Sequence, residues 1–283
     1  MRPPVRSYLY VPGDDGRRIE KALASEADAV VLDLEDAVAP NRKEKARETV
    51  ARLLESVPDE PVFVRVNAVG TELSTADIDA LAGRPLAGLR LPKTESVESV
   101  RLVAETLEEL GSEARIQCLI ESALGLERAF EIATSHERVD GISLGEADLS
   151  ADLGVRDEAG LLYARSRIVS AARAAGLPHP VQSVYTKVQD LDGLRRSTEV
   201  GKRLGFVGRS VIHPSQVPVV NEVFTPTEDE VSEAQGMLDR LDYEASSGTG
   251  AFALEDGRFV DRAVVESARL TLALARRERE VAP

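Results

Sequence analysis

The chain has no tryptophan, and among its 283 residues it has only one cysteine and three histidines. The lone cysteine, Cys118, cannot form an intrachain disulfide, and its apolar neighbours indicate a core position. The histidines are scattered along the sequence, at His136, His179 and His213. Cysteine and histidine therefore lack the spacing of a zinc site.

Basic residues are also in deficit, because 35 Lys and Arg face 49 Asp and Glu, for a formal net charge of −14. Nucleic acids and anionic membranes are therefore not expected as partners. An anionic ligand has to meet a local basic cluster instead. No apolar run approaches a membrane span and no signal-peptide core follows Met1, so a cytoplasmic protein is expected.

The sequence alternates short apolar runs with longer amphipathic segments. Runs such as Ala29–Leu32 are apolar throughout, which is typical of parallel strands covered on both faces by helices. Eight strand candidates can be identified: Ser7–Val11, Ala29–Asp33, Val62–Asn67, Gly88–Pro92, Arg115–Glu121, Gly141–Gly145, Val181–Tyr185 and Gly205–Ile212. Eight β–α units predict a (β/α)8 TIM barrel, with a doubly wound open sheet as the alternative.

The barrel is expected over residues 1–225, and a C-terminal extension over 226–283. Within the extension, a helix is predicted near Glu228–Leu241, a Gly/Ser-rich loop from Glu244, and a last helix over Phe259–Arg277. The extension is too short for a domain, and we expect it to pack on the barrel or on a neighbouring subunit.

Polar side chains follow the strand candidates where each strand ends, which is where barrel enzymes place their catalytic groups. These residues are Asp33, Glu35, Asp36, Arg65, Asn67, Lys93, Glu121, Glu146 and Asp148. Two carboxylates from neighbouring strand ends, Glu121 and Asp148, would suit Mg²⁺, which keeps waters and leaves room for a chelating substrate. The alternative is that each of these acids caps a following helix.

Two basic elements could meet an anion. Arg65 could form a bidentate pair with a carboxylate or hold an enolate oxygen, or instead pair with Asp33 or Glu35. Arg17 and Lys21 follow a Pro-Gly turn and could receive phosphates, although such cations are more often simply solvated.

Several ordered motifs carry a family resemblance that covers nearly the whole chain. They are Arg6–Gly13, Val31–Val38, Val64–Asn67, Leu91–Lys93, Ile120–Ser122, Leu162–Ser166, Ile212–Val217, Val219–Thr225 and Asp256–Asp261. With these motifs the chain resembles the citrate lyase β-subunit-like branch of the HpcH/HpaI aldolase superfamily.

The resemblance implies a homo-oligomeric barrel, a trimer or a multiple of one, with Mg²⁺ (or Mn²⁺) on Glu121 and Asp148. Arg65 would contact the oxo acid or enolate oxygen, with Asp33 and Glu35 orienting Arg65 and the metal waters. The resemblance also implies that backbone N–H groups of Gly145, Glu146 and Ala147 bind the substrate carboxylate and that Lys93 contacts the substrate. Arg17 and Lys21 would bind coenzyme A. Asp261 of the extension would act as a base in a neighbouring subunit's site.

The expected activity is Mg²⁺-dependent, reversible cleavage of a β-hydroxyacyl-CoA into acetyl-CoA, or a short acyl-CoA, and a 2-oxo acid. Leu149 stands where related chains often have an aromatic residue, so malyl-CoA, citramalyl-CoA and 3-hydroxy-3-methylglutaryl-CoA types stay open. The alternatives are a citrate lyase β subunit acting on citryl bound to an acyl carrier protein, a malyl-CoA thioesterase, and a non-catalytic scaffold.

Overall fold

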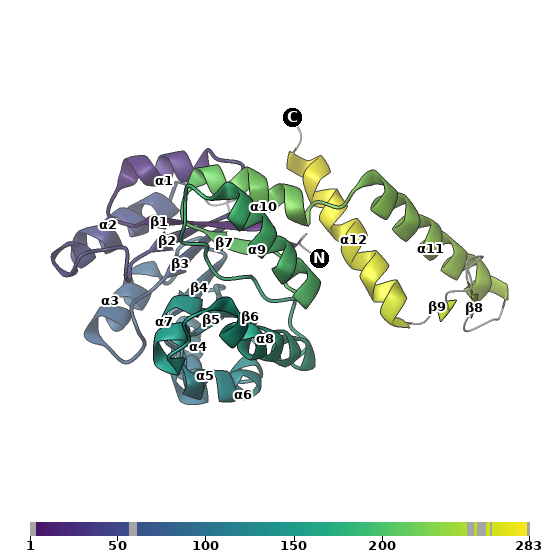
Figure 1. Ribbon diagram of the computed structural model, residues 1–283. Coiled ribbons are helices and arrows are strands. Elements are labelled where there is room, and N and C mark those ends of the chain that lie inside the picture. Colours follow the sequence, from purple (N-terminus) through teal and green to yellow (C-terminus); the bar gives the residue numbers. More distant parts are fainter. Residues whose placement is uncertain (1–3, 57–60, 248–251, 254–258, 261, 282–283) are drawn as a thin grey trace. The chain divides into compact units, whose positions relative to one another are not determined.

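The computed structural model describes residues 4–56, 61–247, 252–253, 259–260 and 262–281. The chain divides into two compact units, of which the larger is Val5–Asn221 and the other contains the chain from Glu222 onward. Each unit is described by itself (Figure 1).

The larger unit is built on one parallel sheet of seven strands in the order β6-β5-β4-β3-β2-β1-β7. The strands are β1 (Ser7–Pro12), β2 (Ala29–Asp33), β3 (Val62–Arg65), β4 (Gly88–Leu91), β5 (Arg115–Ile120), β6 (Val139–Leu144) and β7 (Arg209–Val211). Beyond β7 the sheet continues as a single parallel bridge from Gln182 to Arg209. This succession of eight parallel positions confirms the α/β, TIM-barrel fold.

The helices follow the strands and cover the outside of the sheet. They are α1 (Gly16–Leu23), α2 (Lys43–Leu54), α3 (Glu72–Leu81), α4 (Val97–Glu109), α5 (Ala123–Glu127), α6 (Ala129–Ala133), α7 (Glu146–Leu153), α8 (Leu162–Ala174), α9 (Leu191–Leu204) and α10 (Val217–Phe224), with short 3-10 turns at Pro40–Arg42, Glu158–Leu161 and Pro214–Gln216. Side-chain caps fix several helix starts, as where Ser96 accepts the N–H of Ser99.

Two strand candidates are shorter than predicted. Val181–Tyr185 contributes only the bridge at Gln182, because the preceding Pro178 and Pro180 have no N–H to donate to a ladder. Gly205–Ile212 shrinks to β7, since Gly205 and Gly208 have φ of 96° and 86°, outside the range of a strand.

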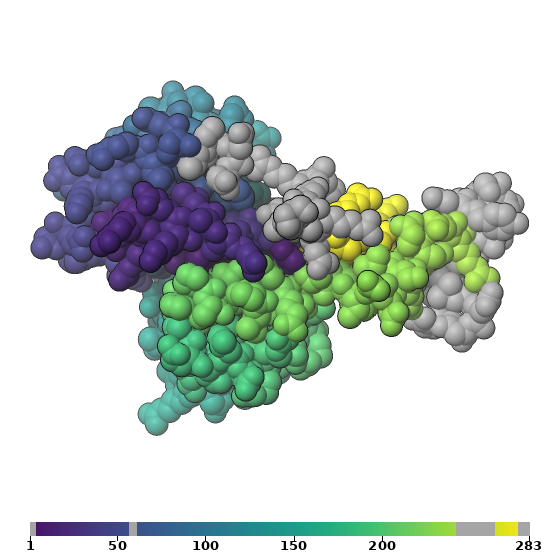
Figure 2. All heavy atoms as spheres, turned by 90° about the horizontal axis from the view of Figure 1, so that it is seen from above, coloured from purple at the N-terminus to yellow at the C-terminus, as the bar shows by residue number. Residues whose placement is uncertain are grey.

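The first and last segments of the larger unit lie side by side, because β1 pairs with both β2 and β7. The Asn221 side chain in α10 donates to the Glu26 carbonyl, 2.8 Å away. In Figure 2 the N-terminal segment, coloured purple, lies against the later segment of this unit, coloured green. Strand β1 therefore lies inside the sheet, between β2 and β7, and it leads directly into α1.

The barrel interior is apolar at one level and polar at the next. Tyr8, Ala29, Val31 and Phe63 form a buried cluster. Strand alternation and pairing place Asp33 and Arg65 one layer beyond it, toward the carboxyl ends of the strands. The sheet thus delivers these polar side chains to the end of the barrel at which strand–helix loops emerge.

The C-terminal unit is a pair of helices, α11 (Glu228–Ser247) and α12 (Arg262–Val281), with a small antiparallel pair, β8 (Phe252–Ala253) and β9 (Phe259–Val260). Ala234, Met237, Val265 and Ala268 form its buried contact. The loop expected from Glu244 begins later, because α11 continues to Ser247, and Phe259 lies in a strand instead of starting the last helix. None of the described helices combines the length and hydropathy of a membrane-spanning segment.

Candidate active site

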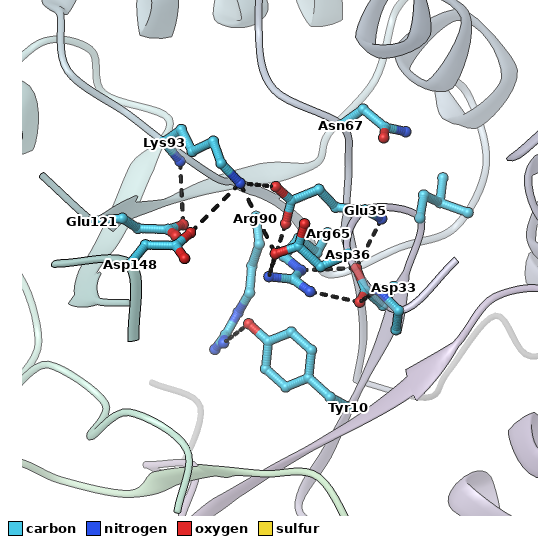
Figure 3. A network of polar contacts seen from close by, with 12 residues as sticks. Tyr10, Asp33, Glu35, Asp36, Arg65, Asn67, Arg90, Lys93, Glu121 and Asp148 are labelled. Atoms are coloured by element: carbon cyan, nitrogen blue, oxygen red, sulfur yellow. Dashed lines mark hydrogen bonds and ion pairs between the residues drawn. The ribbon is translucent and has the colours of Figure 1, made fainter. Parts of the chain in front are cut away.

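Arg65, at the end of β3, is held by two acids that follow β2. Its Nε and Nη2 donate to the two oxygens of Asp33 at 2.8 and 2.6 Å, and its Nη1 lies 2.9 Å from Glu35 Oε2. Burial opposes the charge of Arg65, but hydrogen bonds and attraction from Asp33 raise its pKa above the ordinary value. Arg65 is therefore a fixed cation, and the alternative that the sequence offered, a pairing with Asp33 or Glu35, is present with both acids (Figure 3).

A lysine that the sequence did not single out supports the loop after β2. Lys43 Nζ donates to the carbonyls of Leu34 and Glu35 and to Asn67 Oδ1, each at 2.7 Å. Burial lowers the pKa of Lys43, although nearby acids, Asp33 first, oppose that change. Lys43 therefore ties the loop that carries Glu35 to the end of β3.

Lys93, just after β4, links the two halves of the site. It has a φ of 51°, the only positive φ of a non-glycine residue in the described part of the chain. Its backbone N–H donates to Glu121 Oε1 at 3.2 Å, and its Nζ binds Glu35 and lies 3.6 Å from Asp148 Oδ2. This unusual backbone conformation lets one residue contact Glu121 and Asp148 together.

Glu121 and Asp148 lie side by side, as predicted from the strand order (Figure 3). Burial, as the larger cause, and a hydrogen bond with Asp148 together raise the pKa of Glu121 to about 8. The fit depends on Gly145, because a Cβ there would lie 2.6 Å from Glu121 Cγ and 2.9 Å from its Oε2. Glycine at position 145 thus makes room for the Glu121 carboxyl group.

The turn from Gly145 into α7 is anchored by Arg165 of α8. Arg165 Nε and Nη2 donate to the two oxygens of Glu146 at 2.8 and 2.7 Å, and the Glu146 N–H donates to Ser183 Oγ. The Glu146 side chain is therefore committed to Arg165. The N–H groups of Ala147 and Asp148 lie in the first turn of α7, where they have no partner within the helix.

The structure brings most of the predicted site residues together at one end of the barrel. Asp33, Glu35, Arg65, Lys93, Glu121 and Asp148 are joined by direct contacts, and the Gly145–Ala147 turn adjoins them through Glu121. Arg17 and Lys21 are exposed on α1 and form no ion pair within the described residues. Asp261 lies outside the described residues.

The joined cluster, which we call the acidic mouth, has a deficit of positive charge. It contains the carboxylates of Asp33, Glu35, Asp36, Glu121 and Asp148, and the cations Lys43, Arg65 and Lys93. Five acids against three cations leave two negative charges when all are ionised. Within the described residues, no group of three or more His, Cys, Asp or Glu side chains is arranged to hold a metal ion. An ion at the mouth would therefore rely on the pair Glu121 and Asp148, completed by water or substrate oxygens.

Four further residues contribute to this region. Lys43 and Arg90 were not predicted, and Tyr10 and Arg165 were covered only by the family motifs Arg6–Gly13 and Leu162–Ser166, without a role of their own. Tyr10 lies against Arg65, whose guanidinium carbon is 5.3 Å from the ring centre. Arg90 donates to the Tyr10 hydroxyl at 2.9 Å. For Arg90 the sequence offered one signal, because this arginine stands between two leucines in a strand that was expected to be buried.

The parallel barrel and its acidic mouth define a TIM-barrel enzyme. The family model of HpcH/HpaI aldolase/citrate lyase matches residues 6–214. The chain therefore belongs to this family of lyases, which includes citrate lyase β subunits and CoA-ester lyases.

The relatives include proteins with two different activities. The chain is 37% identical over 277 residues to a (3S)-malyl-CoA thioesterase of Cereibacter sphaeroides, covering 96% of this chain and 95% of that protein. It is 35% identical over 282 residues to the citrate lyase subunit beta of Leuconostoc mesenteroides subsp. cremoris, covering 95% and 93%.

Among solved structures, the fold is similar to that of CitE from Mycobacterium tuberculosis in complex with magnesium, acetoacetate and coenzyme A. The TM-score is 0.77 at 33% identity, and the match covers 97% of this chain and 99% of that chain. A second CitE structure from the same organism, in complex with magnesium and pyruvate, matches with a TM-score of 0.72 at 30% identity, covering 96% and 98%.

The raised pKa of Glu121 predicts a pH-dependent stability. With a folded-state pKa near 8 and an unfolded value of about 4.3, the folded protein keeps a proton that the unfolded chain releases. Without divalent cations, the contribution of Glu121 to stability should be complete below the unfolded pKa and should be lost as pH rises toward 8, by at most about 1.4 kcal/mol per pH unit. Urea unfolding in EDTA should show this fall in the wild type and a flatter profile in Glu121→Gln.

The exposed variant Glu98→Gln, on α4, serves as the matched control and should follow the wild-type profile. Parallel pH profiles for the wild type and Glu121→Gln would show that Glu121 titrates as an ordinary exposed acid.

Proposed function

We propose that the protein is a Mg²⁺-dependent carbon–carbon lyase. It cleaves a β-hydroxyacyl-CoA, such as malyl-CoA or citramalyl-CoA, reversibly into acetyl-CoA, or a short acyl-CoA, and a 2-oxo acid. The observation that carries this proposal is the acidic mouth, where Glu121 and Asp148 lie together beside a fixed arginine.

The residues present fit a divalent cation. With all groups ionised, the mouth would carry two uncompensated negative charges, and burial of Glu121 next to Asp148 opposes ionisation of Glu121 unless a cation joins the two side chains. Carboxylate oxygens with water are the ligands that Mg²⁺ prefers. When bound by Glu121 and Asp148, Mg²⁺ would supply Lewis-acid stabilisation and a template for a chelating oxo acid. Mn²⁺ has similar ligand preferences and would bind at the same carboxylates.

The chain's own residues would orient the acid and stabilise developing negative charge. Arg65 presents a guanidinium whose direction is fixed by Asp33 and Glu35, and it would hold the oxo acid or the enolate oxygen. The unpaired N–H groups at the start of α7, including that of Ala147, would meet the substrate carboxylate. Lys93 would adjust the position of Glu121 and contact the substrate.

Coenzyme A would run across the loop after β1, with its phosphates near Arg17 and Lys21 of α1. Exposure of both cations, without an ion-pair partner among the described residues, supports this assignment. Asp261 would act from the C-terminal extension, residues 226–283, as the base at a neighbouring subunit's site. The active unit would then be a homo-oligomer, a trimer or a multiple of one, in the cytoplasm.

Two related reactions are alternatives to this proposal, because relatives with similar sequence identity to the chain are named for them. One is hydrolysis of malyl-CoA, the activity of the Cereibacter protein, and the other is the role of a citrate lyase β subunit. The three reactions differ in their products, so one experiment separates them.

We therefore predict the outcome of a panel of malyl-CoA, citramalyl-CoA and 3-hydroxy-3-methylglutaryl-CoA with Mg²⁺. From malyl-CoA or citramalyl-CoA, a lyase releases acetyl-CoA and a 2-oxo acid in equal amounts, and from 3-hydroxy-3-methylglutaryl-CoA it releases acetyl-CoA and the 3-oxo acid acetoacetate. A thioesterase releases free coenzyme A instead. Arg65→Lys should lower kcat about 10²–10³-fold, because it removes the bidentate geometry at the developing charge. Arg101→Lys, at an exposed position of α4, should keep wild-type activity.

Cleavage of citryl carried by an acyl carrier protein, together with inert CoA esters, would identify the citrate lyase β role. Failure to cleave any thioester, with or without Mg²⁺, would contradict the lyase proposal.

The role of Asp261 leads to a separate prediction. Asp261→Asn should bind Mg²⁺ as the wild type does but turn over about 10²–10⁴-fold more slowly, since a general base would be lost. Mixing Asp261→Asn with Arg65→Lys subunits should restore part of the activity if the base acts across subunits. A wild-type rate in Asp261→Asn would rule out this role.

A further inference from the structure

Lys93 contacts both Glu121 and Asp148, which we call the metal pair, and it does so through two different groups. Its backbone N–H donates to Glu121 Oε1 at 3.2 Å, and its Nζ lies 3.6 Å from Asp148 Oδ2. Among the described residues, Lys93 is the one cation that forms an ion pair with Asp148. Its ammonium group therefore lies against a carboxylate that is proposed to bind Mg²⁺ (Figure 3).

The other two cations of the acidic mouth are engaged elsewhere. Arg65 pairs with Asp33 and Glu35. The Nζ of Lys43 donates to two backbone carbonyls and one amide oxygen, each at 2.7 Å. Neither of these cations forms an ion pair with the metal pair in the described part of the chain. The positive charge next to the metal pair is therefore that of Lys93.

The backbone of Lys93 is held in place, whereas its ammonium group has room to move. A φ of 51° is a strained conformation for a lysine, and it places the backbone N–H on Glu121. The Lys93 side chain is 45% exposed, against 15% for Arg65. Its Nζ also binds Glu35 and lies 4.0 Å from Asp36. The ammonium group can therefore leave Asp148 and keep other acidic partners.

The charge of Lys93 acts in opposite directions in the empty and the metal-loaded site. Burial opposes this charge, but the hydrogen bond to Glu35 and the attraction of nearby acids raise the pKa of Lys93 above the ordinary value. In the empty site, the ammonium group offsets part of the excess negative charge of the mouth. In the loaded site, Mg²⁺ would add two positive charges to the carboxylate of Asp148, and like charges a few ångström apart repel even in water.

We propose that Lys93 is an internal counter-ion of the metal pair and that it lowers the affinity of this site for divalent cations. It balances the acids while the site is empty and opposes the metal ion at Asp148. When the metal ion binds, the ammonium group gives up Asp148 and stays with Glu35. This inference rests on the metal site of the proposed function, and it gives Lys93 the role of setting how tightly the ion is held. A merely structural role has the opposite sign, because the loss of a support weakens binding.

A titration of the full chain with Mn²⁺, followed by the electron paramagnetic resonance signal of the free ion, tests this role. Lys93→Met removes the charge but keeps an unbranched side chain. It should bind Mn²⁺ about 5- to 50-fold more tightly than the wild type at low salt, because the repulsion is lost. The difference should shrink as NaCl is added, since salt screens an exposed charge. Lys93→Arg keeps the charge and should stay within about threefold of the wild type.

Lys93→Asn is a second neutral variant, in case Lys93→Met does not fold, because asparagine tolerates a positive φ. It should also bind Mn²⁺ more tightly than the wild type. Arg101→Met removes a positive charge at an exposed position of α4 and should bind as the wild type does. Equal or weaker Mn²⁺ binding in a folded neutral variant of Lys93 would overturn the counter-ion role and leave the metal site intact. Failure of the wild type to bind Mn²⁺ would overturn both.

Discussion

The bidentate pair between Arg65 and Asp33 is the interaction on which the rest of the mouth depends. It joins the ends of β2 and β3, and Asp33 also accepts the N–H groups of Glu35 and Ala37, so the loop after β2 is shaped around the same carboxylate. Charge-assisted bonds of this geometry combine strength with direction. Glu35, positioned by that loop, then binds both Arg65 and Lys93 and extends the network toward β4.

From Lys93 the network reaches the two acids on β5 and α7, and here backbone conformation matters as much as charge. The positive φ of Lys93 and the missing side chain of Gly145 allow Glu121 to lie beside Asp148, although burial opposes ionisation of Glu121. Arg165 restrains Glu146 and thereby the start of the helix that carries Asp148. The protein thus maintains a local excess of negative charge, an arrangement expected of a cation site.

Much of the mouth could be predicted from the sequence, because parallel strands in a barrel end at the same rim. That rule alone groups Asp33, Arg65, Glu121 and Asp148. It could not show that Lys43 turns inward from the start of α2, where its charged neighbours indicate a solvated helix. Nor could it show that Glu146 pairs with Arg165, 19 residues away, or that Arg90 crosses the barrel to β1 and β7, since these contacts depend on three-dimensional packing. The roles of Arg17, Lys21 and Asp261, and the boundary of the C-terminal extension, stay predictions.

We propose that Glu121 and Asp148 hold one divalent cation at the acidic mouth. A titration with Mn²⁺, followed by the loss of the free-ion electron paramagnetic resonance signal, measures this directly and needs no substrate. We expect one tight site per chain in the wild type, for which Mg²⁺ competes, and at least about tenfold weaker binding in Asp148→Asn. An Asp148→Asn protein that binds Mn²⁺ with wild-type stoichiometry and affinity would contradict it.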